Sequence, residues 1–164
     1  MIIRNAENMS AGLALCAKIR GFCLDDDGVC VTAQKIEKGL SVSGDQGVYT
    51  VGYCQKSDFF RAIALLAGHL EQGKTAVLIR EAGNFELCGG MIDCSRNAVP
   101  RVERLEELFA TMAMMGMNCV MLYTEDTYEV EDYPYFGYRR GRYSAQELQH
   151  LDQVARSLGL DMIP

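Results

Sequence analysis

The sequence is poor in the residues that hold metal ions and nucleic acids. It has only two histidines and no Cys-x-x-Cys pair, so the usual spacing of a zinc site is missing. Lysine and arginine number 16 against 22 acidic residues, and the resulting formal net charge of -6 disfavours a phosphate-backbone partner. We therefore expect no metal site and no nucleic-acid partner.

Long apolar runs and a secretory signal are also missing. The run from Ala62 to Ala67 is far shorter than the roughly 20 residues of a membrane span. Seven cysteines are present, and Cys16, Cys23 and Cys30 recur at a spacing of seven. Without a secretory signal, an odd number of cysteines predicts reduced, buried thiols. These features predict a soluble, cytoplasmic protein with no membrane partner.

Residues 1–85 have the pattern of a small α+β domain. Its predicted elements are a helix over Ser10 to Arg20, a hairpin of Leu40 to Ser43 and Val48 to Tyr53 around Gly44-Asp45-Gln46-Gly47, a helix capped by Ser57 with an apolar stripe of Phe59, Ile63, Leu66 and Leu70 that ends at Gly73, and a strand over Thr75 to Ile79. The helices are expected to pack on a small sheet.

Residues 86–164 alternate strand and helix patterns. The predicted elements are a strand over Leu87 to Cys94, a helix over Val99 to Met115 with Pro100 in its first turn, a strand over Asn118 to Thr124, a helix over Ser144 to Leu158 with a Ser144/Glu147 capping box, and a strand over Leu160 to Ile163. Such alternation predicts parallel strands, either in a doubly wound sheet or in a (β/α)8 barrel. Because the chain ends within a strand at Pro164, we expect a fragment, about a third of a barrel at most.

Polar side chains follow the first two strands of this second region. Asp93-Cys94-Ser95-Arg96-Asn97 ends one strand, and the run from Tyr123 to Glu129 ends the next. The carboxyl ends of parallel strands are where such folds place function. Gly89-Gly90 precedes the strand end and opens no helix, so the dinucleotide fingerprint is absent. An ion pair between Asp93 and Arg96 is the simplest structural role for those two residues.

The connection from Thr124 to Tyr143 is unusually long, about 20 residues where 2 to 6 are common. It is rich in aromatic and basic side chains: Tyr123, Tyr128, Tyr133, Tyr135, Phe136, Tyr138, Arg139, Arg140, Arg142 and Tyr143. Rings beside acids and guanidinium groups suit a sugar, whose C–H faces stack on rings while charged groups bind its hydroxyls. A self-packed loop that covers a barrel rim or a subunit interface remains an equal alternative.

The second region resembles the start of the catalytic barrel in family 20 glycoside hydrolases. The resemblance rests on Met91-Ile92-Asp93-Cys94-Ser95-Arg96-Asn97, on Asn118 to Glu129 and on Tyr133 to Tyr143. It is strongest to the compact streptococcal-type bacterial exo-β-N-acetylglucosaminidases. Residues 1–85 are similar to their small N-terminal domain, including the Asp25-Asp26-Asp27-Gly28 turn and the Phe59-Phe60-Arg61-Ala62 helix segment.

The resemblance implies a fold and an activity. The fold is an α+β N-terminal domain over residues 1–85, then a truncated (β/α)8 TIM-barrel segment over residues 86–164. The implied activity removes terminal β-linked N-acetylhexosamine from a glycan by substrate-assisted retaining hydrolysis, without metal or organic cofactor. The family's catalytic Asp-Glu pair follows the fourth barrel strand, beyond Pro164, so this chain alone is expected to contain no catalytic residue and to be inactive.

The resemblance also assigns supporting roles to residues of this chain. Glu125 and Asp126 match an acidic pair that supports the catalytic groups, and their side chains should diverge because neighbouring strand residues alternate. Cys88-Gly89-Gly90 occupies the place of a hydroxyl-binding arginine of the family, so that role is vacant or passes to Arg96. Tyr123 would form a pocket wall, with Asp93 and Asn97 behind these groups.

Two other functions remain open. The chain could be a non-catalytic carbohydrate-binding or protein-interaction module or, with less support, a nucleotide-binding α/β protein with a phosphate at a helix N-terminus. A homo-oligomer is also expected, because an incomplete barrel should leave apolar side chains such as Val120, Leu122, Leu108 and Met112 partly uncovered.

Overall fold

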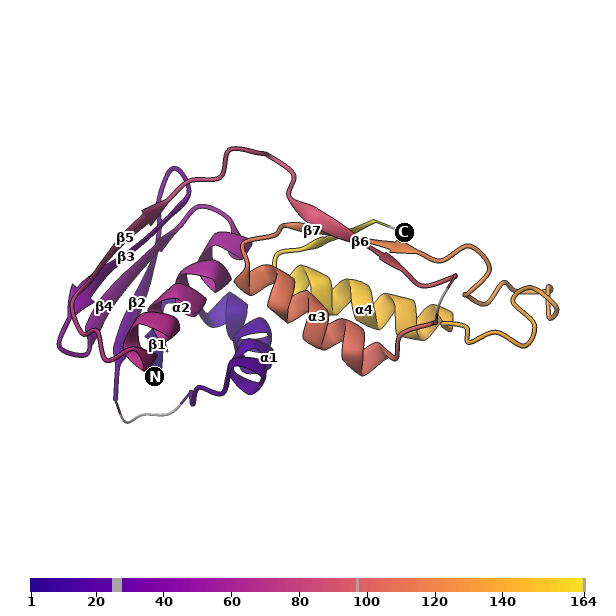
Figure 1. Cartoon of the computed structure of the whole chain (residues 1–164), viewed down its shortest axis with the longest axis horizontal. Coiled ribbons are helices and arrows are strands. Elements are labelled where there is room, and N and C mark those ends of the chain that lie inside the picture. The colour runs from indigo at the N-terminus through magenta and orange to yellow at the C-terminus, as the bar shows by residue number, and fades with distance from the viewer. Residues whose placement is uncertain (25–27, 97, 164) are drawn as a thin grey trace.

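The computed structural model describes residues 1–24, 28–96 and 98–163 (Figure 1). The predicted turn at Asp25-Asp26-Asp27 and the residues Asn97 and Pro164 lie outside this range. The elements in chain order are β1 (Ile2–Arg4), η1 (Glu7–Met9), α1 (Ser10–Arg20), β2 (Cys30–Lys35), β3 (Leu40–Asp45), β4 (Val48–Tyr53), α2 (Lys56–Glu71), β5 (Val77–Glu81), β6 (Gly89–Asp93), α3 (Val102–Met114), β7 (Cys119–Tyr123), α4 (Ala145–Ser157) and β8 (Asp161–Ile163).

The first sheet has five strands in the order β1-β2-β4-β3-β5. β1, β2 and β4 are parallel, whereas β3 is antiparallel to both β4 and β5. The predicted hairpin is therefore confirmed as β3–β4, with its turn at Gln46 and Gly47, whose φ angles of 48° and 86° suit a tight hairpin turn. Sequence patterns did not predict β1 and β2.

Helix α2 covers this sheet with one apolar face. Phe59, Ile63 and Leu66 are at most 1% exposed. The predicted N-cap is wrong, because the helix begins two residues earlier and Gln55 caps it through a capping box with Asp58. Ser57 is instead buried inside the first turn.

The second sheet contains three parallel strands in the order β6-β7-β8. The expected parallel pairing of the first two strands is confirmed. Helix α3 starts at Val102, so Pro100 precedes the helix and does not lie in its first turn. Helix α4 has the predicted capping box, in which Ser144 and Glu147 each bond the other's backbone N–H.

Helix α2 lies against the first sheet, and α3 and α4 lie along one face of the second sheet (Figure 1). α2 packs on β3 and β4, while α1 and α2 both contact α3, and a single hydrophobic core runs through the layers. The expectation that the second region leaves its apolar side chains uncovered is wrong for Val120, Leu122 and Met112, which are all buried. Leu108 alone of that set is exposed, at 39%.

The described residues add three further observations. None of their helices combines the length and the apolar composition needed to cross a membrane.

All seven cysteines are free thiols. Cys16, Cys94 and Cys119 are buried, but Cys23 and Cys88 are exposed, contrary to expectation. Burial raises the pKa of Cys16 to about 12.

Candidate functional site

The predicted functional groups meet at the carboxyl ends of β6 and β7. Asp93 and Tyr123 are partners in the parallel register, and the backbone N–H of Cys94 donates to the carbonyl of Tyr123 over 3.0 Å. Ile92 and Leu122 pack into the core beneath the helices. Because strand side chains alternate, Asp93 and Tyr123 lie on the opposite, helix-free face.

Asp93 organises the turn that follows β6. Its Oδ1 accepts hydrogen bonds from the backbone N–H of Ser95 at 2.9 Å, from the Ser95 hydroxyl at 3.0 Å and from the backbone N–H of Arg96 at 3.0 Å. The backbone N–H groups of Arg96 and Ser95 lower the pKa of Asp93 below its usual value. The expected ion pair with the Arg96 guanidinium is present but long, at 4.0 Å. Asp93 therefore shapes the turn more than it neutralises the arginine.

Arg96 bridges the two strand ends. Its guanidinium donates to the Tyr123 hydroxyl at 3.4 Å, lies 5.1 Å from the centre of that ring, and is 3.8 Å from Glu125 Oε1. The Tyr123 hydroxyl in turn donates to the same Glu125 oxygen at 3.0 Å. The three side chains thus form one exposed cluster of donors and acceptors. Such a cluster can exchange its internal bonds for those of a polyhydroxylated ligand.

Glu125 and Asp126 diverge, as expected for neighbouring residues. Glu125, which has a φ of 49°, turns toward Arg96, whereas the Asp126 carboxylate pairs with Arg140 of the following loop at 3.3 Å. Arg140 also donates to the backbone carbonyl of Ser95. Sequence patterns placed Arg140 in an aromatic, basic loop but did not predict its two partners, because no fixed spacing links an arginine to a carbonyl 45 residues away.

The loop between β7 and α4 is folded upon itself on one side. Tyr128 and Phe136 meet edge to face at 5.3 Å, and Arg142 donates to the Phe136 carbonyl at 2.6 Å. Tyr143 is buried and donates to the Pro100 carbonyl at 2.6 Å, and burial raises the pKa of its hydroxyl well above the usual value. This side matches the expected self-packed loop. The other side exposes the rings of Tyr133, Tyr135 and Tyr138.

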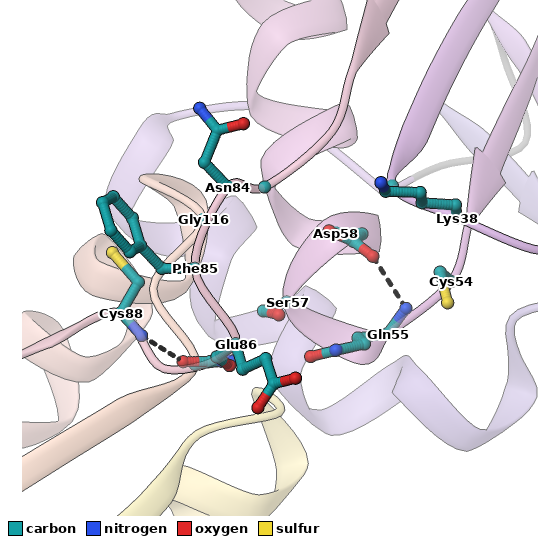
Figure 2. A pocket seen from close by; sticks show the side chains of 13 residues that line it. Lys38, Cys54, Gln55, Ser57, Asp58, Asn84, Phe85, Glu86, Cys88 and Gly116 are labelled. Atoms are coloured by element: carbon teal, nitrogen blue, oxygen red, sulfur yellow. Dashed lines mark hydrogen bonds between the residues drawn. The ribbon is translucent and has the colours of Figure 1, made fainter.

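A hollow of about 440 Å³ lies at the other end of the second sheet (Figure 2). Cys88 and Asn118, which line it, immediately precede β6 and β7. The Cys88 backbone N–H donates to the Asn118 side chain over 2.8 Å, so these groups already satisfy one another. Parallel sheets place their chemistry at the carboxyl ends of their strands. We therefore assign the candidate site to the Arg96 end.

The described residues contain no group of three or more His, Cys, Asp or Glu side chains placed to hold a metal ion. The polar groups at the candidate site are instead a guanidinium, a phenol and carboxylates. This set matches hydroxyl groups better than it matches a cation, because Arg96 occupies the position beside Glu125 that a cation would need.

Comparison with known proteins identifies related folds. Residues 20–82 match the model of the N-acetyl-beta-D-glucosaminidase N-terminal domain. Among solved structures, an inactive mutant of a family 20 exo beta-N-acetylglucosaminidase from Vibrio harveyi is 16% identical, with a TM-score of 0.76. The match covers 99% of this chain and 32% of the Vibrio harveyi chain. The N-acetyl-beta-hexosaminidase of Streptomyces plicatus in complex with Thio-NAglucal is 15% identical, with a TM-score of 0.75. The match covers 100% of this chain and 41% of the Streptomyces plicatus chain. No curated protein matches.

The resemblance to family 20 glycoside hydrolases is thus confirmed, in the N-terminal region by the domain match and across the whole chain by the fold. The mixed α+β architecture, with its sheets and four α-helices, agrees with this similarity in fold. The chain spans less than half the length of these solved structures.

Proposed function

We propose that this chain forms the N-terminal domain and the first part of the catalytic barrel of a β-N-acetylhexosaminidase. The observation that carries the proposal is the chain-long similarity in fold to family 20 enzymes, together with the domain match over residues 20–82. We assign residues 1–85 to the α+β domain and residues 86–164 to the start of a (β/α)8 barrel. The parallel order β6-β7-β8, with α3 and α4 on one face, supports this division.

The proposed substrate is a glycan with a terminal β-linked N-acetylhexosamine. Two Streptomyces plicatus mutant structures, solved with N-acetylglucosamine as product, support this class of ligand. In the whole protein, a carboxylic acid from a later barrel strand would protonate the leaving oxygen while the sugar's own acetamido oxygen attacks the anomeric carbon. This mechanism needs no metal or organic cofactor.

The residues of this chain would bind and position the sugar. Arg96 and Glu125 would exchange their 3.8 Å contact for hydrogen bonds to sugar hydroxyls, and the Tyr123 ring would form a wall of the pocket. Asp126 would act behind them. Its Oδ1 is buried and accepts no well-aligned hydrogen bond from the described residues, so its carboxylate depends on the charge of Arg140 3.3 Å away.

The test compares two proteins with a chromogenic N-acetylglucosaminide. We expect the 164-residue chain to stay at background, because removing a general acid alone typically costs about 10²- to 10⁴-fold in rate. If the reading frame continues past residue 164, the whole gene product should turn over the substrate. Glu125→Gln and Asp126→Asn in that protein should slow turnover without unfolding it.

Two outcomes would contradict the proposal. Clear turnover by the short chain, abolished by Glu125→Gln, would mean that the catalytic residues lie within residues 1–164. An inactive whole protein that still binds N-acetylglucosamine would favour a non-catalytic carbohydrate-binding module.

We also propose that the 164-residue chain self-associates, through a different surface from the one that the sequence predicted. Met91 is 63% exposed on the helix-free face of the second sheet, and its register partner Met121 lies beside it. An uncovered apolar sheet face of this kind favours association. Light scattering of the 164-residue chain at tens of micromolar should give a mass larger than that of a monomer. A cytoplasmic location remains part of the same proposal.

A further inference from the structure

The loop between β7 and α4 holds three large rings in solvent. Tyr133, Tyr135 and Tyr138 are 66%, 81% and 61% exposed. Tyr135 and Tyr138 meet edge to face at 5.9 Å, and the Arg139 guanidinium lies 5.5 Å from the centre of the Tyr138 ring. Clustered aromatic side chains in solvent commonly mark a binding surface, because their apolar area remains unburied until a ligand covers it.

This surface is held in place from behind. Phe136 packs against Tyr128, and Arg142 fixes the Phe136 carbonyl. Gly137 is buried, with a φ of 66°, and a side chain there would collide with the Asp126 carbonyl. Phe136 and Gly137 thus face the inside of the loop, whereas Tyr135 and Tyr138, on either side of them in the sequence, face solvent. A ligand would meet rings on a braced backbone and would lose little affinity to loop ordering.

The same loop is attached to the candidate site. Arg140, two residues after Tyr138, pairs with Asp126 and donates to the carbonyl of Ser95, whose neighbour is Arg96. A hollow of about 510 Å³ in the same loop is lined by Tyr133 and Arg142 together with the acidic residues Glu129, Glu131 and Asp132. The rings and carboxylates therefore belong to the loop that Arg140 attaches to the place where the terminal sugar is proposed to bind.

We propose that Tyr133, Tyr135 and Tyr138 bind the sugar units that follow the terminal N-acetylhexosamine of the glycan. The inference rests on the proposed function and names a second part of the same substrate. Tyrosine rings stack on the C–H faces of sugars, and the nearby carboxylates accept hydrogen bonds from hydroxyls.

A second copy of the chain fits this surface less well. A twofold-symmetric contact would bury the same patch of both copies, and the hollow on this patch carries three acidic residues, Glu129, Glu131 and Asp132, against one arginine, Arg142. Bringing like charges together while removing water from them is unfavourable. A sugar is uncharged and keeps these carboxylates hydrogen-bonded.

The test is an NMR titration of the ¹⁵N-labelled 164-residue chain with N-acetylglucosamine and, separately, with its β-1,4-linked trisaccharide. We expect the trisaccharide to bind more tightly and to shift amides of residues 133–139 that the monosaccharide leaves unchanged. Tyr135→Leu and Tyr138→Leu should each reduce trisaccharide affinity by about 2- to 10-fold, with monosaccharide affinity unchanged. Phe85→Leu is the matched control, because Phe85 is also 81% exposed but lies outside the loop.

The outcomes separate this inference from the proposed function. Equal affinities for the two ligands, with shifts confined to the surroundings of Arg96 and Glu125, would overturn the inference and leave the proposed function standing. The absence of shifts with either sugar would count against both. If the tyrosine variants instead turned an oligomer into a monomer in sedimentation, the surface would be a self-interface and the inference would be wrong. The mapping of wild-type shifts tests the inference even if a variant fails to fold.

Discussion

The guanidinium of Arg140 lies 3.3 Å from the carboxylate of Asp126, across a loop of 13 intervening residues. The same guanidinium donates to the carbonyl of Ser95, which belongs to the turn after the neighbouring strand. One side chain therefore connects the ends of β6 and β7 with the aromatic loop. This connection gives the loop a defined position relative to Arg96 and Glu125.

Replacing Arg140 with alanine should lower the free energy of unfolding by about 0.5–1.5 kcal/mol. The pair is partly exposed, so solvent screens the lost charge interaction, but the Ser95 carbonyl also loses a donor. Urea denaturation measures the change, and limited proteolysis should show faster cleavage within residues 125–143. Arg139→Ala is the matched control, because the contact that the described residues give the Arg139 guanidinium is with the exposed ring of Tyr138. An equal effect of both substitutions would contradict the bridging role of Arg140.

Gly137 is expected to tolerate alanine less well than Gly73. Both have a left-handed φ, 66° and 72°, so both substitutions strain the backbone. A Cβ on Gly137 would collide with the Asp126 carbonyl oxygen, whereas nothing lies within 4 Å of one on Gly73.

We therefore expect Gly73→Ala to cost about 1 kcal/mol and Gly137→Ala about 2–3 kcal/mol, unless the loop shifts to relieve the contact. Thermal and urea unfolding measure the costs. Amide shifts across residues 126–142 would reveal a displaced loop, and equal costs without any loop shift would count against the packing described for Gly137.

The turn after β6 should depend on pH through Asp93. Backbone N–H groups of Arg96 and Ser95 lower the pKa of this carboxyl in the folded chain, so the ionised form is the one that the fold stabilises. The contribution is therefore present above the unfolded pKa and is lost as pH falls through the folded pKa. Carbon-detected NMR should show Asp93 titrating below the usual aspartate range. In Asp93→Asn, the amide shifts of Ser95 and Arg96 should lose that pH dependence, and its persistence would assign the transition to another group.

The Ser144 cap should support helix α4. Its hydroxyl accepts from the backbone N–H of Glu147 at 3.2 Å, and the Glu147 carboxylate accepts from the backbone N–H of Ser144 at 2.8 Å. Ser144→Ala should cost about 1 kcal/mol in urea denaturation. The Ser144 backbone N–H lowers the pKa of Glu147, so this carboxylate contributes stability at neutral pH that disappears as pH falls through its folded pKa.

Ser43→Ala is the control for the cap, because Ser43 is an exposed strand residue. The expected cost there is within about 0.5 kcal/mol. A Ser144 variant that is no less stable than the Ser43 variant would show that tertiary packing alone holds the first turn of α4.

Local patterns by themselves determined several elements of this protein. The apolar spacing of Ser10 to Arg20 matches the bounds of α1, the Gln46-Gly47 turn lies where the hairpin was expected, and the Ser144/Glu147 box starts α4. Each depends on interactions within about five residues, which a sequence displays directly. Glu125 and Asp126 have different partners as expected, but both lie in the turn after β7, where Glu125 has a φ of 49°, so strand alternation is not the reason.

Tertiary structure decided what depends on distant partners. β1 is three residues long and forms through pairing with β2, across 25 intervening residues. Ser57 is buried near Gly159, and Val120 and Leu122 are covered because they share one core with apolar side chains of α3 and α4. Arg140 pairs with Asp126 and Ser95 because the fold brings them within its reach. A long flexible side chain has no preferred sequence spacing, so only the folded chain defines this bridge.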